Sequence, residues 1–277
     1  MLTSLVFTLT TEHPLTFPPH LGRASHAAFL RLVARSDPGL AEQLHLSNER
    51  RPFTCSNLWG LRRQGQGLVM EPGATAFLRY TGLSAPVSEH LQRWAEEPPP
   101  EIELDGAALT VQQATLDPAL HPWAGQTSYE KLAAAHLLPA GRPDSRVELE
   151  FASATAFRSA GHVVPFPLPE LVYGGLLGKW NDFAPVAVSE EMRRFAGEMV
   201  VVSRYRLKTV AFRAKSKSLQ IGFVGRCRYT ALNKDRYWLG VLQLLGEYAF
   251  YAGVGYQTTV GMGQVRRSAE RRGGGDD

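Results

Sequence analysis

Histidine supplies the most useful side chains for chemistry in this sequence. There are eight histidines, at positions 13, 20, 26, 45, 90, 121, 136 and 162. An imidazole has an ordinary pKa of about 6.5, so its acid and base forms are both populated near neutral pH. The acidic pairs Glu96-Glu97 and Glu190-Glu191 are adjacent in sequence, so their side chains point apart and cannot cage one cation. With no His-x-x-Glu or Asp-x-Asp cluster, and no CxxC motif formed by Cys55 and Cys227, we expect neither a metal nor a cofactor.

Positive charge is concentrated in the second half of the chain. Residues 1–140 contain 10 basic and 13 acidic residues, whereas residues 141–277 contain 20 and 13. The segment 200–234 contains no acidic residue and nine basic ones: Arg204, Arg206, Lys208, Arg213, Lys215, Lys217, Arg226, Arg228 and Lys234. A region of one sign favours a polyanionic partner, and the alternative is a solvated basic face without a ligand.

Four glycines, Gly253, Gly255, Gly261 and Gly263, lie in the stretch GVGYQTTVGMGQVR. The stretch follows a predicted helix and precedes a short strand, which is the reverse of the order in a dinucleotide-binding site. It also lacks the Gly-Lys-Ser/Thr triplet of a P-loop. Two interpretations stay open: backbone amides that bind phosphate, and tight packing between domains.

The hydrophobic pattern predicts one order of elements twice. Strands are expected over 2–11, 53–58, 74–80 and 101–116 with helices over 22–34 and 87–95, then strands over 146–157, 200–214, 219–232 and near 265 with helices over 170–182 and 237–251. Loops are expected over 62–67 and over the proline-rich segment before residue 170. We therefore predict an α+β protein with two tandem ferredoxin-like (RRM-like, βαββαβ) domains. Their expected bounds are 1–117 and 145–268, with a linker over 118–144 and a disordered tail over 269–277.

Length and hydropathy exclude a membrane-spanning chain. The sequence has 277 residues, a mean hydropathy of −0.17 and no stretch near the roughly 20 apolar residues that cross a bilayer. The apolar first segment lacks the basic start and small-residue cleavage site of a signal peptide. We expect a cytoplasmic protein without a membrane partner.

Several motifs together resemble one known family. They are SHAAFL at 25–30, LAEQLHLSNERRPFTCSNLWG at 40–60, HPWAG at 121–125, GFVGRCRY at 222–229 and the glycine-rich stretch. In this order they are similar to the CRISPR-associated repeat-processing endoribonucleases of the RAMP superfamily. The resemblance covers nearly the whole chain except its tail, and it implies two ferredoxin-like domains that face one another.

The resemblance also implies a reaction. Such an enzyme cleaves CRISPR precursor RNA within each repeat, without metal, and so produces mature guide RNAs. The ribose 2′-hydroxyl attacks the adjacent phosphate and leaves 2′,3′-cyclic phosphate and 5′-hydroxyl ends. This step needs a base, an acid for the departing 5′-oxygen and cations beside the phosphate.

Particular residues match the positions that carry this chemistry in the family. His45 is expected to be the general base and His26 the general acid. Arg50 and Arg51 stand where many members have a lysine. The residues expected to bind RNA are Arg50, Arg51, Arg204, Arg206, Lys208, Arg213, Lys215, Lys217, Gly253, Gly255, Gly261 and Gly263.

The expected partner is CRISPR repeat RNA, either single-stranded or as a stem-loop. Other CRISPR effector subunits and a homodimer are open as further partners. The alternative function is a catalytically inactive RAMP-type RNA-binding subunit of an effector complex. A small-molecule enzyme that uses the glycine-rich stretch is a third hypothesis, but it does not explain the basic segment.

Overall fold

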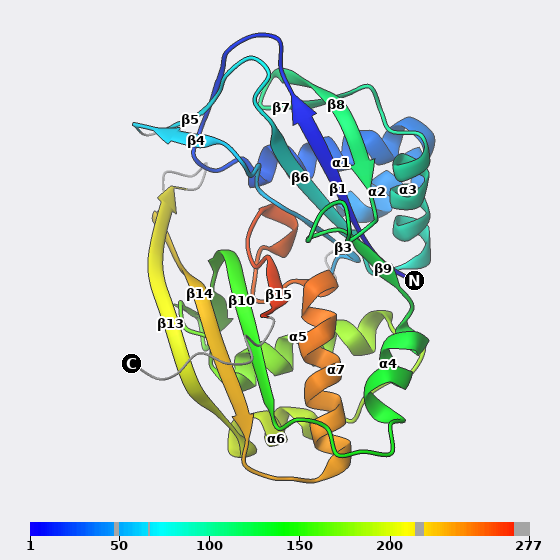
Figure 1. The fold of residues 1–277 in the computed structure, drawn as a ribbon, viewed down its shortest axis with the longest axis vertical. Coiled ribbons are helices and arrows are strands. Elements are labelled where there is room, and N and C mark those ends of the chain that lie inside the picture. The colour runs from blue at the N-terminus through cyan, green and yellow to red at the C-terminus, as the bar shows by residue number, and fades with distance from the viewer. Residues whose placement is uncertain (47–49, 66, 214–218, 269–277) are drawn as a thin grey trace.

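Two main antiparallel β-sheets, each with helices packed on it, form the framework of the protein (Figure 1). The computed structural model describes residues 1–46, 50–65, 67–213 and 219–268. The expected hairpin cations Lys215 and Lys217, and the expected tail over 269–277, lie outside the described residues. Within the described residues, no helix is long and apolar enough to cross a membrane.

The first sheet contains the expected strands of the N-terminal half. Its order is β3-β6-β1-β8-β7, and it packs against α1, α2 and α3. β1 lies in the middle because its nine residues are nearly all buried and it pairs with strands on both sides. The bounds are β1 (Leu2–Thr10), α1 (Gly22–Ser36), α2 (Pro38–Leu46), β3 (Phe53–Cys55), β6 (Ala76–Gly82), α3 (Ala85–Glu96), β7 (Glu101–Leu104) and β8 (Ala107–Thr115).

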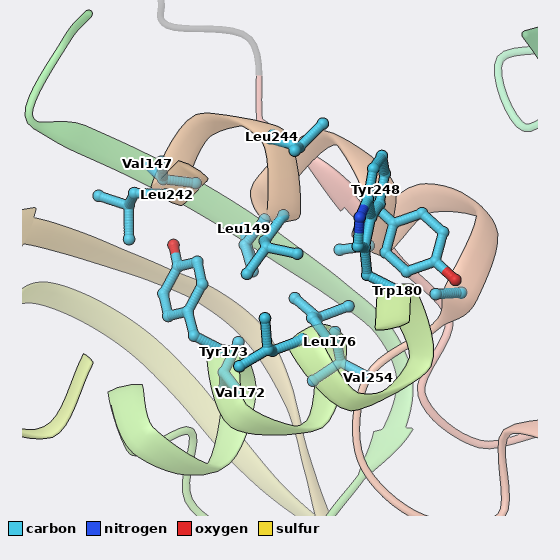
Figure 2. Packing of buried hydrophobic residues seen from close by; sticks show 14 of the residues in the cluster. Val147, Leu149, Val172, Tyr173, Leu176, Trp180, Leu242, Leu244, Tyr248 and Val254 are labelled. Carbon is cyan, nitrogen blue, oxygen red and sulfur yellow. The ribbon is translucent and has the colours of Figure 1, made fainter. Parts of the chain in front are cut away.

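The second sheet has the order β13-β14-β10-β15 and packs against α5, α6 and α7. The bounds are β10 (Arg146–Thr155), α5 (Pro169–Phe183), α6 (Glu191–Met199), β13 (Val200–Arg213), β14 (Leu219–Ala231), α7 (Arg236–Ala252) and β15 (Val265–Arg267). Alternation along β10 buries Val147 and Leu149 and turns Glu148 toward the other face. In the core between this sheet and its helices, Trp180 and Tyr248 pack with ring centroids 5.2 Å apart (Figure 2).

Both halves therefore show the predicted βαββαβ order in an α+β fold. In each sheet the first strand of the unit lies between the third and the fourth, as the ferredoxin-like arrangement requires. The two large hydrophobic clusters lie mainly one in each half, and the C-terminal cluster also includes Leu2 and Leu83.

Six short strands were not expected from the sequence. β2 (Leu15–Phe17), β5 (Gly67–Met70) and β4 (Arg62–Gln64) form a small sheet that includes the expected 62–67 loop. β11 (Phe157–Ser159) pairs with β12 (His162–Val164) in the proline-rich region. Within the expected linker, β9 (Gly125–Thr127) pairs with β1, and it is followed by α4 (Tyr129–Leu137). Segments of three or four residues are too short to show a hydrophobic period, and their pairing depends on the partner strand.

A buried arginine joins the two halves. Arg79 on β6 is 1% exposed, and its guanidinium donates to Gln264 Oε1 at 2.5 Å and to the Phe250 carbonyl at 2.6 Å. It also donates to Ser4 Oγ at 2.8 Å and lies over the ring of Trp123, 5.1 Å from its centroid. Burial lowers the pKa of Arg79 to about 9, which leaves the guanidinium charged at pH 7. The oxygens of Phe250 and Gln264 belong to the C-terminal half, whereas Arg79 belongs to the N-terminal sheet. This buried cation therefore links the two halves.

We predict that Arg79→Met lowers the free energy of unfolding by about 3 kcal/mol, because it leaves the buried oxygens of Gln264 and Phe250 without their donor. Urea denaturation measures the change. The matched control is Arg31→Met, since Arg31 is exposed and its ion pair with Glu103 spans 3.7 Å. The control should lose less than about 1 kcal/mol. Equal losses in the two variants would contradict the role given to Arg79.

Candidate active site at the junction of the two halves

The glycine-rich stretch lies directly against the first helix and the third strand. A β-carbon added to Gly22, the first residue of α1, would lie 1.8 Å from the Val260 carbonyl oxygen. Gly261 has a φ of +92° and donates its N–H to the Cys55 carbonyl at 3.0 Å. Ser56 and Gly261 also form a parallel β-bridge. The backbone of the C-terminal half thus approaches that of the N-terminal half more closely than any larger residue would allow at these positions.

Most of the glycine amides expected to bind RNA are used inside the protein. Gly253 donates to the Ala249 carbonyl at 2.9 Å, and Gly263 donates to the Ala154 carbonyl at 3.0 Å. With Gly261, three of the four N–H groups therefore already have protein acceptors. A β-carbon on Gly255, whose φ is +84°, would lie 2.3 Å from the Ala156 carbonyl oxygen. Of the two interpretations left open by the sequence, these contacts favour tight packing for Gly253, Gly261 and Gly263.

His26 is held by this loop. It lies on α1, and its Nδ1 is 3.0 Å from the carbonyl oxygen of Thr259 in the 3-10 turn η1 (Thr258–Val260). A carbonyl can only accept, so Nδ1 carries the proton in this contact. Nε2 is 3.4 Å from Nη1 of Arg51, which is a donor only. Burial lowers the pKa of His26, the Thr259 contact opposes this shift, and the charges of Arg51 and His45 lower it further. The ring is therefore neutral at pH 7 and turns an unprotonated Nε2 toward Arg51.

His45 lies at the C-terminal end of α2 and is exposed. Its backbone carbonyl accepts from Nη2 of Arg51 at 3.3 Å, so one guanidinium contacts both His26 and the His45 backbone. The charge of a protonated His45 adds a small contribution to the lowered pKa of His26. Two of the expected site residues, His26 and Arg51, are thus in contact, and His45 is joined to them through its backbone carbonyl.

A third imidazole at this site was missed by the sequence analysis. His20 is partly buried just before α1, and its ring carbon Cε1 lies 3.3 Å from the position of a β-carbon on Gly261. Burial lowers the pKa of His20, and a hydrogen bond to the Val260 carbonyl opposes this shift. The charge of Arg23 lowers the pKa further. No local pattern could have identified His20, because it meets the site through a loop near the other end of the chain.

The two arginines expected beside the histidine have different partners. Arg50 donates to Asp182 Oδ2 on α5 at 2.7 Å and forms an ion pair between the two halves. A β-carbon on Gly178 would lie 2.7 Å from its guanidinium nitrogens. Arg51 is therefore the arginine placed at the His26 imidazole, whereas Arg50 is paired with α5.

Exposed cations follow the outer face of the second sheet. Arg204, Arg206 and Lys208 on β13 are exposed, and Arg204 and Arg206 pair in register with Arg228 and Arg226. Arg228 is 3.0 Å from Glu148 and Arg226 is 3.8 Å from Glu150. Among the described residues, no ion pair involves the three β13 cations. Arg213 lies at the end of β13, but its side chain is outside the described part of the chain.

Two family models match the chain. The "CRISPR Cas6 N-terminal domain" matches residues 1–134, and "CRISPR-associated endoribonuclease Cas6" matches residues 149–265. The chain belongs to the Cas6 family. The resemblance found in the sequence is confirmed, and it places the two ferredoxin-like halves in a family with the same tandem arrangement.

Curated Cas6 relatives match part of the chain. A "CRISPR-associated endoribonuclease Cas6" from Mycobacterium tuberculosis is 28% identical over 134 residues, which are 45% of this chain and 40% of that protein. One from Streptococcus thermophilus is 26% identical over 118 residues, 42% of this chain and 48% of that protein. The aligned regions thus span less than half the length of these two relatives.

Solved Cas6 structures match nearly the whole chain. A Cas6 product complex is 27% identical, covers 97% of this chain and 99% of its own, and has a TM-score of 0.77. Cas6 from Thermus thermophilus is 25% identical, with coverages of 97% and 98% and a TM-score of 0.73. A Cas6-related protein from Pyrococcus furiosus shares the fold at 12% identity and a TM-score of 0.64.

We predict that Gly22→Ala weakens the contact between α1 and η1, because its methyl group would overlap the Val260 carbonyl. The free energy of unfolding should fall by about 2 kcal/mol, and the histidine side-chain NMR signals should change. Gly175→Ala is the matched control, since Gly175 also lies in a helix but has no atom within 4 Å of an added β-carbon. That control should be neutral or slightly stabilising. A Gly22→Ala protein as stable as Gly175→Ala would refute the close approach.

Proposed function

We propose that this Cas6-family protein is a metal-independent endoribonuclease that cleaves CRISPR precursor RNA within its repeats. In this proposal the 2′-hydroxyl beside the scissile phosphate attacks the phosphorus, and the 5′-oxygen departs. The products are a 2′,3′-cyclic phosphate and a 5′-hydroxyl. The observation that carries the proposal is the cluster of His26, His45 and Arg51 at the junction of the two halves. It contains the proton-transfer groups and the cation that the reaction needs.

The hydrogen bonds of His26 suit the general base. Its Nδ1–H donates to the Thr259 carbonyl, so the electron pair of the ring lies on Nε2 and can accept the proton of the 2′-hydroxyl when Arg51 turns to the phosphate. The lowered pKa keeps this nitrogen unprotonated at neutral pH. His45 is exposed and is then the general acid that protonates the 5′-oxygen. This arrangement reverses the two roles expected from the sequence, where the hydrogen bonds of neither ring were known.

Arg51 is the cation proposed to stabilise the transition state. Its Nη1 lies 3.4 Å from His26 Nε2, a distance long enough that the arginine can exchange this contact for a phosphate oxygen. A guanidinium offers two parallel donors to a phosphate, which supports charge on both non-bridging oxygens.

The basic face of β13 is proposed to bind the RNA backbone. Arg204, Arg206 and Lys208 have no ion pair within the described residues, so they can bind phosphates without breaking one. Stem-loop RNA is recognised largely through shape and phosphates, which such a row of cations can bind. Solved relatives include a Cas6 product complex and a Cas6 substrate mimic complex, which supports an RNA partner for this chain.

We predict that the protein cleaves its cognate repeat RNA at one position in the presence of EDTA. His26→Ala and His45→Ala should each lower the single-turnover rate by about 100-fold or more, while the affinity for RNA changes little. Deoxyribose on the 5′ side of the scissile phosphate should abolish cleavage. His162→Ala is the control, since His162 is exposed on β12. RNA that stays bound and intact would instead show a non-catalytic subunit.

A sulfur-substituted substrate distinguishes the two roles. A 5′-thiolate departs without protonation, so an RNA with a bridging 5′-sulfur at the scissile position needs no general acid. His45→Ala should recover most of its lost rate on this substrate, and His26→Ala should not. The opposite pattern would restore the assignment made from the sequence.

We predict that the triple change of Arg204, Arg206 and Lys208 to Ala weakens binding and flattens its salt dependence. Each lost phosphate contact lowers the slope of log affinity against log salt by about 0.7 to 0.9. A change of about 2 to 2.7 is therefore expected from three contacts. The control changes Arg31, Arg93 and Lys131, exposed residues of equal total charge on α1, α3 and α4. Equal slopes for both triple variants would exclude β13 as the binding face.

A further inference from the structure

Lys179 on α5 makes three hydrogen bonds to the segment that follows α7. Its Nζ is 2.6 Å from the Ala252 carbonyl oxygen, 3.2 Å from the Gly253 carbonyl oxygen and 3.2 Å from Thr258 Oγ1. An ammonium has three donors, and these three acceptors use all of them. A neutral amine has one donor fewer, so the arrangement fits the charged form.

The first two acceptors lie at the C-terminal end of α7. Ala252 is the last residue of that helix, and Gly253 is its C-cap with a φ of +61°. The last carbonyls of a helix have no partner within it, and the partial negative charge at this end attracts a cation. The ammonium therefore donates to the last backbone oxygens of α7, at the point where the chain leaves the helix and turns toward η1.

The third acceptor links the lysine to the candidate active site. Thr258 begins η1, and the next residue, Thr259, provides the carbonyl that accepts the hydrogen bond from His26 Nδ1. Lys179 thus holds one end of a three-residue turn, and His26 contacts the same turn at its middle residue. A shift of η1 would move or release the acceptor that fixes the orientation and the protonated nitrogen of the imidazole.

We propose that Lys179 is a positioning residue, which holds η1 against the end of α7 so that the Thr259 carbonyl keeps His26 Nε2 unprotonated and aimed at the substrate. Lys179 acts through η1 and does not take part in the proton transfers. This inference rests on the proposed function for its effect on cleavage, whereas its effect on His26 can be observed without RNA. Burial and the charge of Arg50 lower the pKa of Lys179 to about 7. The same surroundings that bind the ammonium therefore also make it easier to deprotonate.

The test compares Lys179→Met with Lys131→Met, a change of the exposed lysine on α4. Lys179→Met should lower the cleavage rate at saturating repeat RNA by about 10- to 100-fold, because misplacement of a catalytic group costs about that much. The dissociation constant for RNA should change less than threefold. Lys131→Met should leave both quantities at their wild-type values.

The second readout is the tautomer of His26 in the protein without RNA. In ¹⁵N-histidine NMR spectra, with the His26→Ala variant used for assignment, wild-type protein should show a protonated Nδ1 and an unprotonated Nε2. The Lys179→Met variant should lose this preference for a protonated Nδ1. If Lys179 only stabilised the fold, its replacement would leave the His26 tautomer unchanged. An unchanged His26 signal together with a wild-type rate would overturn the proposal.

A further variant covers the case in which Lys179→Met does not fold. Thr258→Val keeps the shape and the lysine but removes one of its three acceptors, so it should shift the His26 signal in the same direction by a smaller amount. No shift in a folded Thr258→Val protein would also overturn the proposal. If wild-type protein bound repeat RNA without cutting it, the proposed function would fail, and the NMR comparison would still decide the role of Lys179.

Discussion

The close contact of two backbones, one from each half of the chain, fixes the geometry of the candidate site. α1 begins at Gly22 against the Val260 carbonyl, and Gly261 is bridged to Ser56, the residue after β3. Because backbone atoms meet directly, neither half can slide without breaking hydrogen bonds that water could not easily replace in a buried position. His26 lies one turn along α1, and its imidazole donates a hydrogen bond to the Thr259 carbonyl beside the same contact.

Buried or partly buried cations hold this contact from both sides. Arg79 enters from the N-terminal sheet and binds oxygens of α7 and of the residue before β15. Lys179 enters from α5 and binds the end of α7 and η1. Each cation donates to neutral carbonyl, amide or hydroxyl oxygens and not to a carboxylate. Each therefore holds the chain segment that carries these oxygens in place. The chain between α7 and β15 is thereby held at its start and close to its end, with the active-site turn between.

Much of the fold could be predicted because its signals are local. The alternation of Val147, Leu149 and Phe151 marks β10, and the strands of both halves appear in the predicted order. The strands of three or four residues were missed, since β9 is defined by its pairing with β1 and not by its own composition. For the same reason the sequence could not distinguish the roles of Arg50 and Arg51, which are adjacent and of one type. In the structure Arg50 binds Asp182, whereas Arg51 faces His26.

The sequence by itself determined the class of fold, the family, the basic character of β13 and the pair of histidines at the site. These features depend on residue type and on spacing along the chain, which a sequence records directly. Only the tertiary structure decided that three of the four glycine amides have protein acceptors, that His20 joins the site and that the His26 proton lies on Nδ1. Those facts depend on contacts between α1 and a turn at the far end of the chain, and they exist only once both halves have folded and packed together.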